Sequence, residues 1–316
     1  MVRMLWAHAK SAYFSFVTKR RGAPNGIPSL PGAAMSTLSA AVMPSAVRAN
    51  LGYLAPGENA PVHYAYEPPS GTPWESVRYD EREIEIGDAR LLREPSVHRE
   101  GFALCDATTD LRDHRDEDEI YRTYYPELEA LALAATGGQH AYVFDHLVRE
   151  NIPARGALNF GRSARGENAA PNARIHNDYT ERSGRRRLGM VLGEDIAHTA
   201  PRYCIVNVWR SLRGPVLDTP LAVCDARSIG VADLVEAEVR YPRRNGEIYV
   251  LLHAPRHRWW YYPGLDKHEA LVFKQYDSQL SGVARMVPHA AFAHPQVPAD
   301  ALPRLSIEAR CLVLFD

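Results

Sequence analysis

A histidine and an aspartate stand two residues apart in the stretch Arg174-Ile-His-Asn-Asp-Tyr-Thr180. On a β-strand, residues two apart point to the same face. His176 and Asp178 would therefore present an imidazole and a carboxylate to one point. With a second histidine from elsewhere they form a 2-His-1-carboxylate site, which leaves one face of a non-haem iron open. Because an ordinary polar turn can also contain H-x-D, further residues must support this interpretation.

The third ligand must come from a histidine distant in the sequence. His289 lies far downstream of His176, which leaves room for the intervening strands of a β-rich domain. His253 and His257 are the alternatives. They sit in a basic and aromatic segment, which favours contact with substrate or solvent. We therefore expect His176, Asp178 and His289 to hold the metal.

An arginine and a serine follow His289 at the start of the last predicted strand, as Arg304-Leu-Ser306. On one strand face, a guanidinium offers a two-pronged grip on a carboxylate and a hydroxyl adds a hydrogen bond. Arg304 and Ser306 are thus candidates for holding the far carboxylate of a dicarboxylic cosubstrate such as 2-oxoglutarate. Arg310 shares this face and remains the alternative anchor. Either arginine could instead form a surface ion pair of little energetic value.

Other side chains could contribute to the site or to the core. Asn207 shares a strand face with Trp209, and either faces the cosubstrate or packs with its amide satisfied. Lys274 and Asp277 are expected to form an internal ion pair, with contact to the cosubstrate as the alternative. Large amphipathic rings often line ligand pockets. The residues predicted on this ground for the substrate pocket are Tyr179, Trp209, Trp259 and Tyr261.

The elements that would position these residues are mostly strands. Polar and apolar residues alternate over residues 83–86, which predicts the first strand, closed by a turn at Gly87-Asp88. Residues 116–135 predict a helix, which Pro126 splits or kinks and Gly137-Gly138 ends. Residues 152–172 are typical of a long loop. Short strands separated by turns predict a double-stranded β-helix, or jelly roll, with an N-terminal α/β lead-in. Further strands are predicted at 102–104, 141–144, 205–210, 221–225, 247–253, 259–262, 270–274 and 306–315.

Composition narrows the classes of function. The 316 residues carry a formal net charge of −1, so no global field points to nucleic acid or to an acidic membrane. The four cysteines form no C-x-x-C pair, which fits reduced thiols in a cytoplasmic protein. The sequence contains no run of about 18 apolar residues, so it predicts no membrane-spanning helix. These features favour an enzyme acting on a small molecule.

Residues 1–34 differ from the rest of the chain. They contain basic residues and no acidic residue, and they end in a stretch rich in Gly and Pro. We expect a disordered extension, or sequence upstream of a true start at Met35. An arginine-rich targeting peptide is the alternative. Residues 35–316 are expected to form a single jelly-roll oxygenase domain.

Several stretches resemble the CmcJ/NvfI-like oxidoreductases, which include the cephamycin 7α-hydroxylation protein and fungal hydroxylase/desaturases. Their order and spacing over about residues 50–316 are similar to those of the family. The chain departs from the family at Trp260, Gly264 and His268, which bears on substrate identity. The matching stretches are His176–Thr180, Ile205–Arg210, Pro220–Ser228, Trp259–Pro263, Phe273–Ser278, His289–Phe292 and Arg304–Arg310.

The resemblance implies an Fe(II)/2-oxoglutarate-dependent oxygenase that uses O₂ to hydroxylate or desaturate a small molecule, in secondary metabolism. Members of this family are often labelled methyltransferases, so methyl transfer is one alternative. The sequence shows no Gly-rich loop after an early strand, as a nucleotide-type cofactor fold would need. A second alternative is a non-catalytic jelly-roll subunit of a tailoring complex, against which the intact H-x-D and R-x-S motifs argue.

Overall fold

The structure, a computed structural model, describes residues 46–57, 60–152 and 168–316. The predictions for residues 1–34 and for most of the loop at 152–172 concern residues outside these ranges. Residues 44–316 belong to one structural unit. No helix among the described residues is long and apolar enough to cross a membrane.

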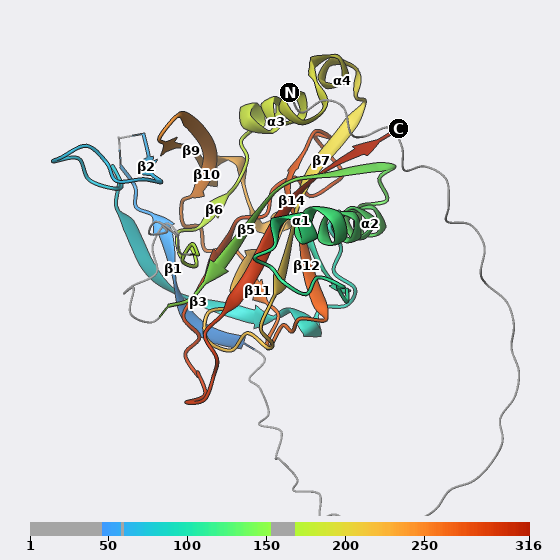
Figure 1. Ribbon diagram of the computed structural model, residues 1–316. Helices are drawn as coiled ribbons and strands as arrows, with labels where there is room; N and C mark the ends of the chain where they lie inside the picture. The colour runs from blue at the N-terminus through green and yellow to red at the C-terminus, as the bar shows by residue number, and fades with distance from the viewer. Residues whose placement is uncertain (1–45, 58–59, 153–167) are drawn as a thin grey trace, which may run out of the picture. The chain divides into compact units, whose positions relative to one another are not determined.

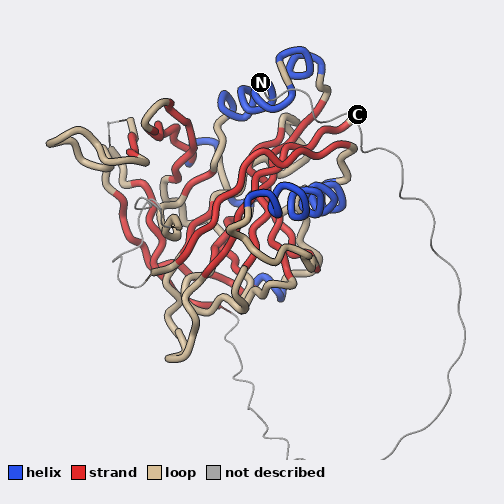
Figure 2. The backbone as a smooth tube through the Cα atoms, in the orientation of Figure 1, coloured by secondary structure: helices blue, strands red, loops and turns tan. Residues whose placement is uncertain are grey.

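Within the described residues the strands form two sheets (Figures 1 and 2). The larger sheet contains, in spatial order, β1 (Ala46–Leu54), β3 (Tyr79–Asp88), β11 (Trp259–Tyr261), β8 (Leu221–Cys224), β13 (His289–Ala291), β6 (His176–Asn177), β10 (Arg244–Leu251), β9 (Leu234–Tyr241) and β2 (Val62–Tyr64). The smaller sheet contains β4 (Phe102–Asp106), β12 (Glu269–Asp277), β7 (Arg202–Ser211), β14 (Leu305–Phe315) and β5 (His140–Glu150).

The two sheets face one another, as the contact between Phe273 of β12 and His289 of β13 shows, with ring centroids 4.8 Å apart. Pairing within the smaller sheet is antiparallel throughout. The predicted jelly roll with its α/β lead-in is confirmed. The predicted turn at Gly87-Asp88 is wrong, because β3 continues through Asp88 and pairs there with Tyr261.

Helices cover the outer face of the smaller sheet. The predicted helix is present as α1 (Glu117–Glu119), the π-helical turn η2 (Ile120–Tyr124) and α2 (Tyr125–Thr136). Pro126 lies where the π-helical turn η2 gives way to α2, so the hydrogen-bonding pattern of the helical stretch changes at the proline. Gly137, at φ +69°, ends the helix in the left-handed conformation. The sequence did not reveal α3 (Glu181–Leu192) or α4 (Glu194–Thr199), nor the short 3₁₀ turns η1 (Ala89–Leu91), η4 (Ala226–Ser228) and η5 (Val231–Asp233).

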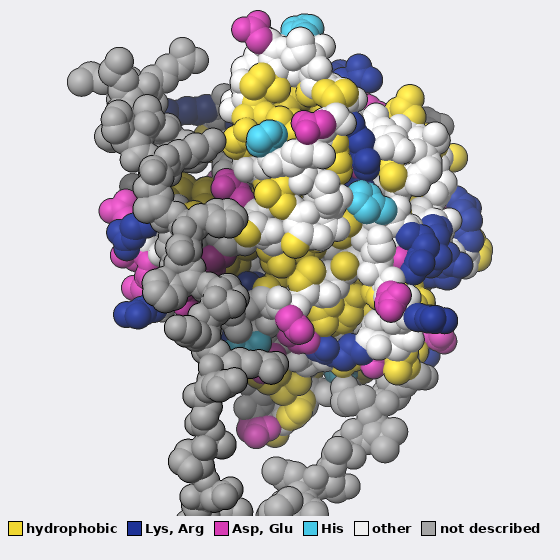
Figure 3. Space-filling model, turned by 90° about the vertical axis from the view of Figure 1, so that its right-hand side faces the viewer, with side chains coloured by type: hydrophobic (Ala, Val, Ile, Leu, Met, Phe, Trp, Pro, Cys, Tyr) yellow, Lys and Arg dark blue, Asp and Glu magenta, His cyan; other side chains and the backbone are white. Residues whose placement is uncertain are grey.

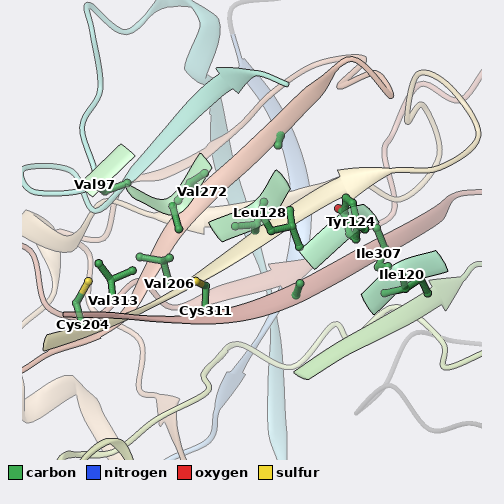
Figure 4. Close-up of a cluster of buried hydrophobic side chains, with 14 residues drawn as sticks. Val97, Ile120, Tyr124, Leu128, Cys204, Val206, Val272, Ile307, Cys311 and Val313 are labelled. Carbon is green, nitrogen blue, oxygen red and sulfur yellow. The ribbon is translucent and has the colours of Figure 1, made fainter. Parts of the chain in front are cut away.

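Side chains along β7 and β14 point alternately to the two faces of the smaller sheet. One set of side chains packs against the helix in a cluster without accessible surface (Figure 4), and the alternate residues face the larger sheet. On β7 the inward residues are Asn207 and Trp209; on β14 they are Ser306, Glu308 and Arg310. The cluster contains Ile120, Tyr124, Leu128, Cys204, Val206, Val208, Ile307, Ala309, Cys311 and Val313.

The surface is mixed in character. On the face that Figure 3 shows, acidic and basic side chains both occur among hydrophobic and uncharged ones. This distribution agrees with a sequence in which 37 basic residues nearly balance 38 acidic ones. The exposed ion pairs, such as that between Arg48 and Glu83, contribute little to stability.

Lys274 and Asp277 form the predicted internal ion pair at 2.7 Å, and neither side chain has accessible surface. Arg202 also binds the Asp277 carboxylate at 2.9 Å. Burial alone would raise the pKa of Asp277, but the hydrogen bond from Arg202 and the charge of Lys274 bring it below its ordinary value. The Arg202–Asp277 contact joins the end of β12 to β7, which carries Asn207 and Trp209.

Replacing Asp277 by asparagine is expected to destabilise the fold by about 3–5 kcal/mol, because Lys274 would remain buried and uncompensated. Urea unfolding measures this change. Since the folded-state pKa of Asp277 is lowered, its contribution is complete above about pH 4 and is lost as the pH falls below the ordinary aspartate value. The free energy of unfolding of the variant should therefore fall less on acidification than that of wild type. A variant as stable as wild type at neutral pH would show that the pair is dispensable.

Candidate metal centre

Three side chains converge between the two sheets. The ligand atoms of His176, Asp178 and His289 all lie within 4.8 Å of one another. His176 of β6 and His289 of β13 are directly paired across neighbouring strands, with ring centroids 4.3 Å apart. Asp178 follows β6 two residues after His176, and its Oδ1 lies 3.5 Å from His176 Nε2. The structure therefore brings together all three predicted ligands.

The backbone orients both imidazoles. His176 Nδ1 lies 2.8 Å from the carbonyl oxygen of Arg174, and His289 Nδ1 lies 3.3 Å from that of Val287. A carbonyl at Nδ1 favours a proton on that nitrogen and leaves Nε2 as the metal-binding atom. The Asn172 amide, which lies 3.3 Å from His176 Nδ1, adds a further contact that the sequence did not reveal.

Electrostatics keep the three groups in their ligating forms. Burial is the main cause that lowers the pKa of His176 and of His289 to about 4, so both imidazoles are neutral at neutral pH. Burial would raise the pKa of Asp178, but the charges of Arg310 and of the two histidines hold it well below its usual range. Two neutral imidazoles and one carboxylate are the donor set of the open facial iron site.

The smaller sheet holds the carboxylate of Asp178 in place. Asp178 Oδ2 accepts hydrogen bonds of 2.9 Å from Asn207 Nδ2 and from Arg310 Nε, while Oδ1 faces His176. Asn207 and Arg310 are paired across β7 and β14. The remaining nitrogens of Arg310 bind Asp145 and Glu308. Arg310 is thus occupied by three carboxylates.

Arg304 differs from Arg310 in having no carboxylate partner among the described residues. It is 2 % exposed; its Nε donates to Ser306 Oγ at 2.9 Å and its Nη1 to the Thr219 carbonyl at 3.0 Å. The guanidinium lies over the Trp209 ring, 4.9 Å from the centroid. Burial, followed by the positive charge of Arg149, lowers the pKa of Arg304 to about 9.

Three buried polar atoms with no hydrogen-bond partner accompany Arg304. They are Asn207 Oδ1, Trp209 Nε1 and Thr219 Oγ1. Asn207 binds Asp178, whereas Trp209 and Thr219 both contact Arg304. Since buried polar groups are normally paired, the Trp209 N–H, the Thr219 hydroxyl and the unneutralised guanidinium favour an anionic ligand that extends from the metal centre to Arg304. The Asn207 oxygen can only accept a hydrogen bond.

The other predicted site residues lie elsewhere. On β8, Val223 is paired with His289, and the next residue, Cys224, points to the opposite face of the sheet. Trp259 is paired with Cys224 and so points to that opposite face as well. Trp259 donates to the Tyr53 hydroxyl at 2.7 Å, and Tyr261 packs on Phe292. Both side chains thus lie on the far face of the sheet, contrary to their expected place in the pocket wall, because the alternation along β11 points them away from His289.

Tyr179 and the two alternative histidines also lie in separate clusters. Tyr179 packs beneath α3, with Arg187 over its ring. His253 meets Tyr53 edge to face, with 5.0 Å between centroids, and His257 binds Asp233 and the Tyr53 hydroxyl. Neither alternative histidine belongs to the group formed by His176, Asp178 and His289.

A jelly roll with a 2-His-1-carboxylate cluster between its sheets defines the class of non-haem metal oxygenases. Residues 51–314 match the family model described as oxidoreductase/YMDC permease-like domain. The hydroxylase/desaturase efuI of Hormonema carpetanum is 32% identical, over 76% of this chain and 86% of its own length. The Fe(II)/2-oxoglutarate-dependent dioxygenase nvfI of Aspergillus novofumigatus is 30% identical, over 81% and 92%.

A solved structure, titled iron and alpha-ketoglutarate-dependent endoperoxidase NvfI, superposes with a TM-score of 0.74 at 25% identity, and covers 86% of this chain and 98% of that one. The chain belongs to this family of fungal hydroxylase/desaturases and NvfI-like dioxygenases. The family resemblance noted in the sequence is confirmed.

Proposed function

We propose that this chain is an Fe(II)/2-oxoglutarate-dependent oxygenase that hydroxylates or desaturates a small molecule in secondary metabolism. The observation that carries the proposal is the convergence of His176, Asp178 and His289 beside a buried arginine, Arg304, for which the described part of the chain offers no carboxylate partner. The names of the relatives, a hydroxylase/desaturase and an Fe(II)/2-oxoglutarate-dependent dioxygenase, agree with this chemistry. The four free cysteines fit a reducing compartment such as the cytoplasm.

In this proposal iron binds His176, Asp178 and His289, and the far carboxylate of 2-oxoglutarate binds Arg304 and Ser306. Together the two groups would supply the activation of O₂ that oxidises the substrate. Arg310 and Asn207 hold the Asp178 carboxylate, because their nitrogens are already bound to it. The unpaired atoms of Trp209 and Thr219 line the cosubstrate site. The buried surroundings keep water from the reacting atoms.

The test is an anaerobic titration of the purified apoprotein with Fe(II) and 2-oxoglutarate. We expect the visible charge-transfer band of the iron–2-oxoglutarate chelate in wild type, and its loss in His176→Ala, because one ligand of the facial site is missing. Absence of the band in wild type at saturating iron would refute the proposal. Binding of S-adenosylmethionine would then indicate a methyltransferase. If the protein bound neither the iron chelate nor S-adenosylmethionine, it would be a non-catalytic subunit.

A further inference from the structure

Arg149 is a third arginine on the inner face of the smaller sheet. It lies on β5 and is paired directly with Ser306 of β14, so the two side chains leave the sheet on the same side. Ser306 in turn accepts the hydrogen bond from Arg304. Arg149 Nη1 donates to the Ala170 carbonyl at 2.8 Å, and the side chain keeps some accessible surface, unlike Arg304.

Arg149 lies near both Arg304 and the side chains that hold Asp178. Its strand partner Ser306 accepts from Arg304, and the charge of Arg149 contributes, after burial, to the lowered pKa of Arg304. Asp145, four residues before Arg149 on the same face of β5, binds Arg310, which in turn binds Asp178. Arg149 therefore shares the inner face of the smaller sheet with Arg304 and Arg310.

No ion pair joins Arg149 to a carboxylate within the part of the chain that the structure describes. The acidic group that acts on it most strongly is Glu308, whose Oε1 is hydrogen-bonded to Arg310 at 3.0 Å. The partly buried side chain of Arg149 is thus left without a carboxylate partner among the described residues.

Binding of metal and cosubstrate would leave this charge in place. A divalent metal would be balanced by Asp178 and the near carboxylate of 2-oxoglutarate, and Arg304 by the far carboxylate. Glu308 offsets Arg310, whose outer nitrogen also meets Asp145, a half-exposed and therefore solvated carboxylate. On the inner face of the smaller sheet, as far as the structure describes it, the charge of Arg149 then remains without a carboxylate partner. Such a charge is costly unless an anion joins it.

We propose that Arg149 binds an anionic group of the substrate, so that this enzyme acts on a small organic acid whose carboxylate lies on the inner face of β5. The inference rests on the proposed function. Arg304, fully covered, takes the cosubstrate, whereas Arg149, nearer to solvent, is accessible to a second ligand that enters afterwards. A charge-assisted, two-pronged contact of this kind discriminates strongly between a carboxylate and its neutral amide.

The experiment compares wild type with Arg149→Gln, Arg149→Lys and the control Arg48→Gln, which removes an exposed strand arginine. Each protein is first titrated anaerobically with Fe(II) and 2-oxoglutarate. The probes are then decanoate and 4-phenylbutyrate, each against its primary amide, with binding to the chelate followed by ligand-observed NMR. We expect wild type to bind each acid at least about tenfold more tightly than its amide. Arg149→Gln should lose this preference, Arg149→Lys should keep part of it, and Arg48→Gln should keep all of it.

The 2-oxoglutarate titration separates the two proposals. Arg149→Gln should keep the chelate band and a half-saturating 2-oxoglutarate concentration within about threefold of wild type, since Arg304 holds the cosubstrate. A loss of 2-oxoglutarate affinity in Arg149→Gln would make Arg149 a cosubstrate residue and overturn the inference. Equal or absent binding of acid and amide by wild type would also overturn it. A wild type without the chelate band would refute the proposed function itself.

Discussion

Arg304→Gln is expected to raise the half-saturating concentration of 2-oxoglutarate by at least about 100-fold, because one partner of a buried charge pair is removed. The glutamine keeps much of the side-chain length but cannot neutralise a carboxylate. Ser306→Ala should have a smaller effect, of about 3–10-fold, since a single neutral hydrogen bond is lost. Anaerobic titration of the iron chelate with 2-oxoglutarate measures both changes without any knowledge of the substrate.

Arg213→Gln is the matched control for this prediction. Arg213 lies near the same strand end, where it binds the Pro303 carbonyl and Glu150, but it is partly exposed and belongs to no predicted site. Its replacement should leave the affinity for 2-oxoglutarate unchanged. If Arg304→Gln retained wild-type affinity, the cosubstrate would have to lie elsewhere, and the unpaired atoms of Trp209 and Thr219 would need another explanation.

The convergence of His176, Asp178 and His289 was in part predictable from the sequence, because strand geometry fixes the relation of the first two locally. The two-residue spacing of His176 and Asp178 places both side chains on the same side of a strand end, and His289 lies far enough downstream to leave room for the intervening strands. The same alternation gave Arg304 and Ser306 a common face. The hydrophobic alternate residues of β7 and β14 likewise predicted two core strands correctly.

The choice between Arg304 and Arg310 could not be made from the sequence. Both lie on one face of β14, and their difference arises from the residues opposite them. Arg310 meets Asp178 and Asp145, whereas Arg304 meets Thr219 and Trp209. These pairings join strands distant in the sequence, and a single sequence without alignment contains no trace of them.

Arg149 and the helices α3 and α4 were missed for related physical reasons. Arg149 stands in a strand of mixed polar and apolar residues, and only its pairing with Ser306 reveals its place. In α3, Gly184 and Gly189 weaken the helix pattern, but packing requires Gly184, since a Cβ there would lie 2.7 Å from the Tyr276 ring. The capping box of Thr180 and Ser183 was the available signal for the start of α3.

His289→Ala is expected to abolish the chelate band and to lower iron affinity by more than about 100-fold, because even residues that only support a ligand change metal affinity by about 10–100-fold. His289 is 2 % exposed and packs against Phe273, so alanine would also leave a cavity. His289→Gln retains most of the volume and should lose iron as well. Anaerobic iron titration measures the affinity, and circular dichroism verifies that each variant is folded.

His253→Ala is the matched control, since it removes a partly buried histidine from the alternative cluster beside Tyr53. It should bind iron as wild type does, because its imidazole lies outside the group formed by His176, Asp178 and His289. The opposite pattern, with iron lost in His253→Ala and retained in a folded His289→Gln, would mean that His289 is not a ligand. The paired geometry of β6 and β13 argues against that pattern, since it brings the imidazoles of His176 and His289 together whenever the two strands are joined.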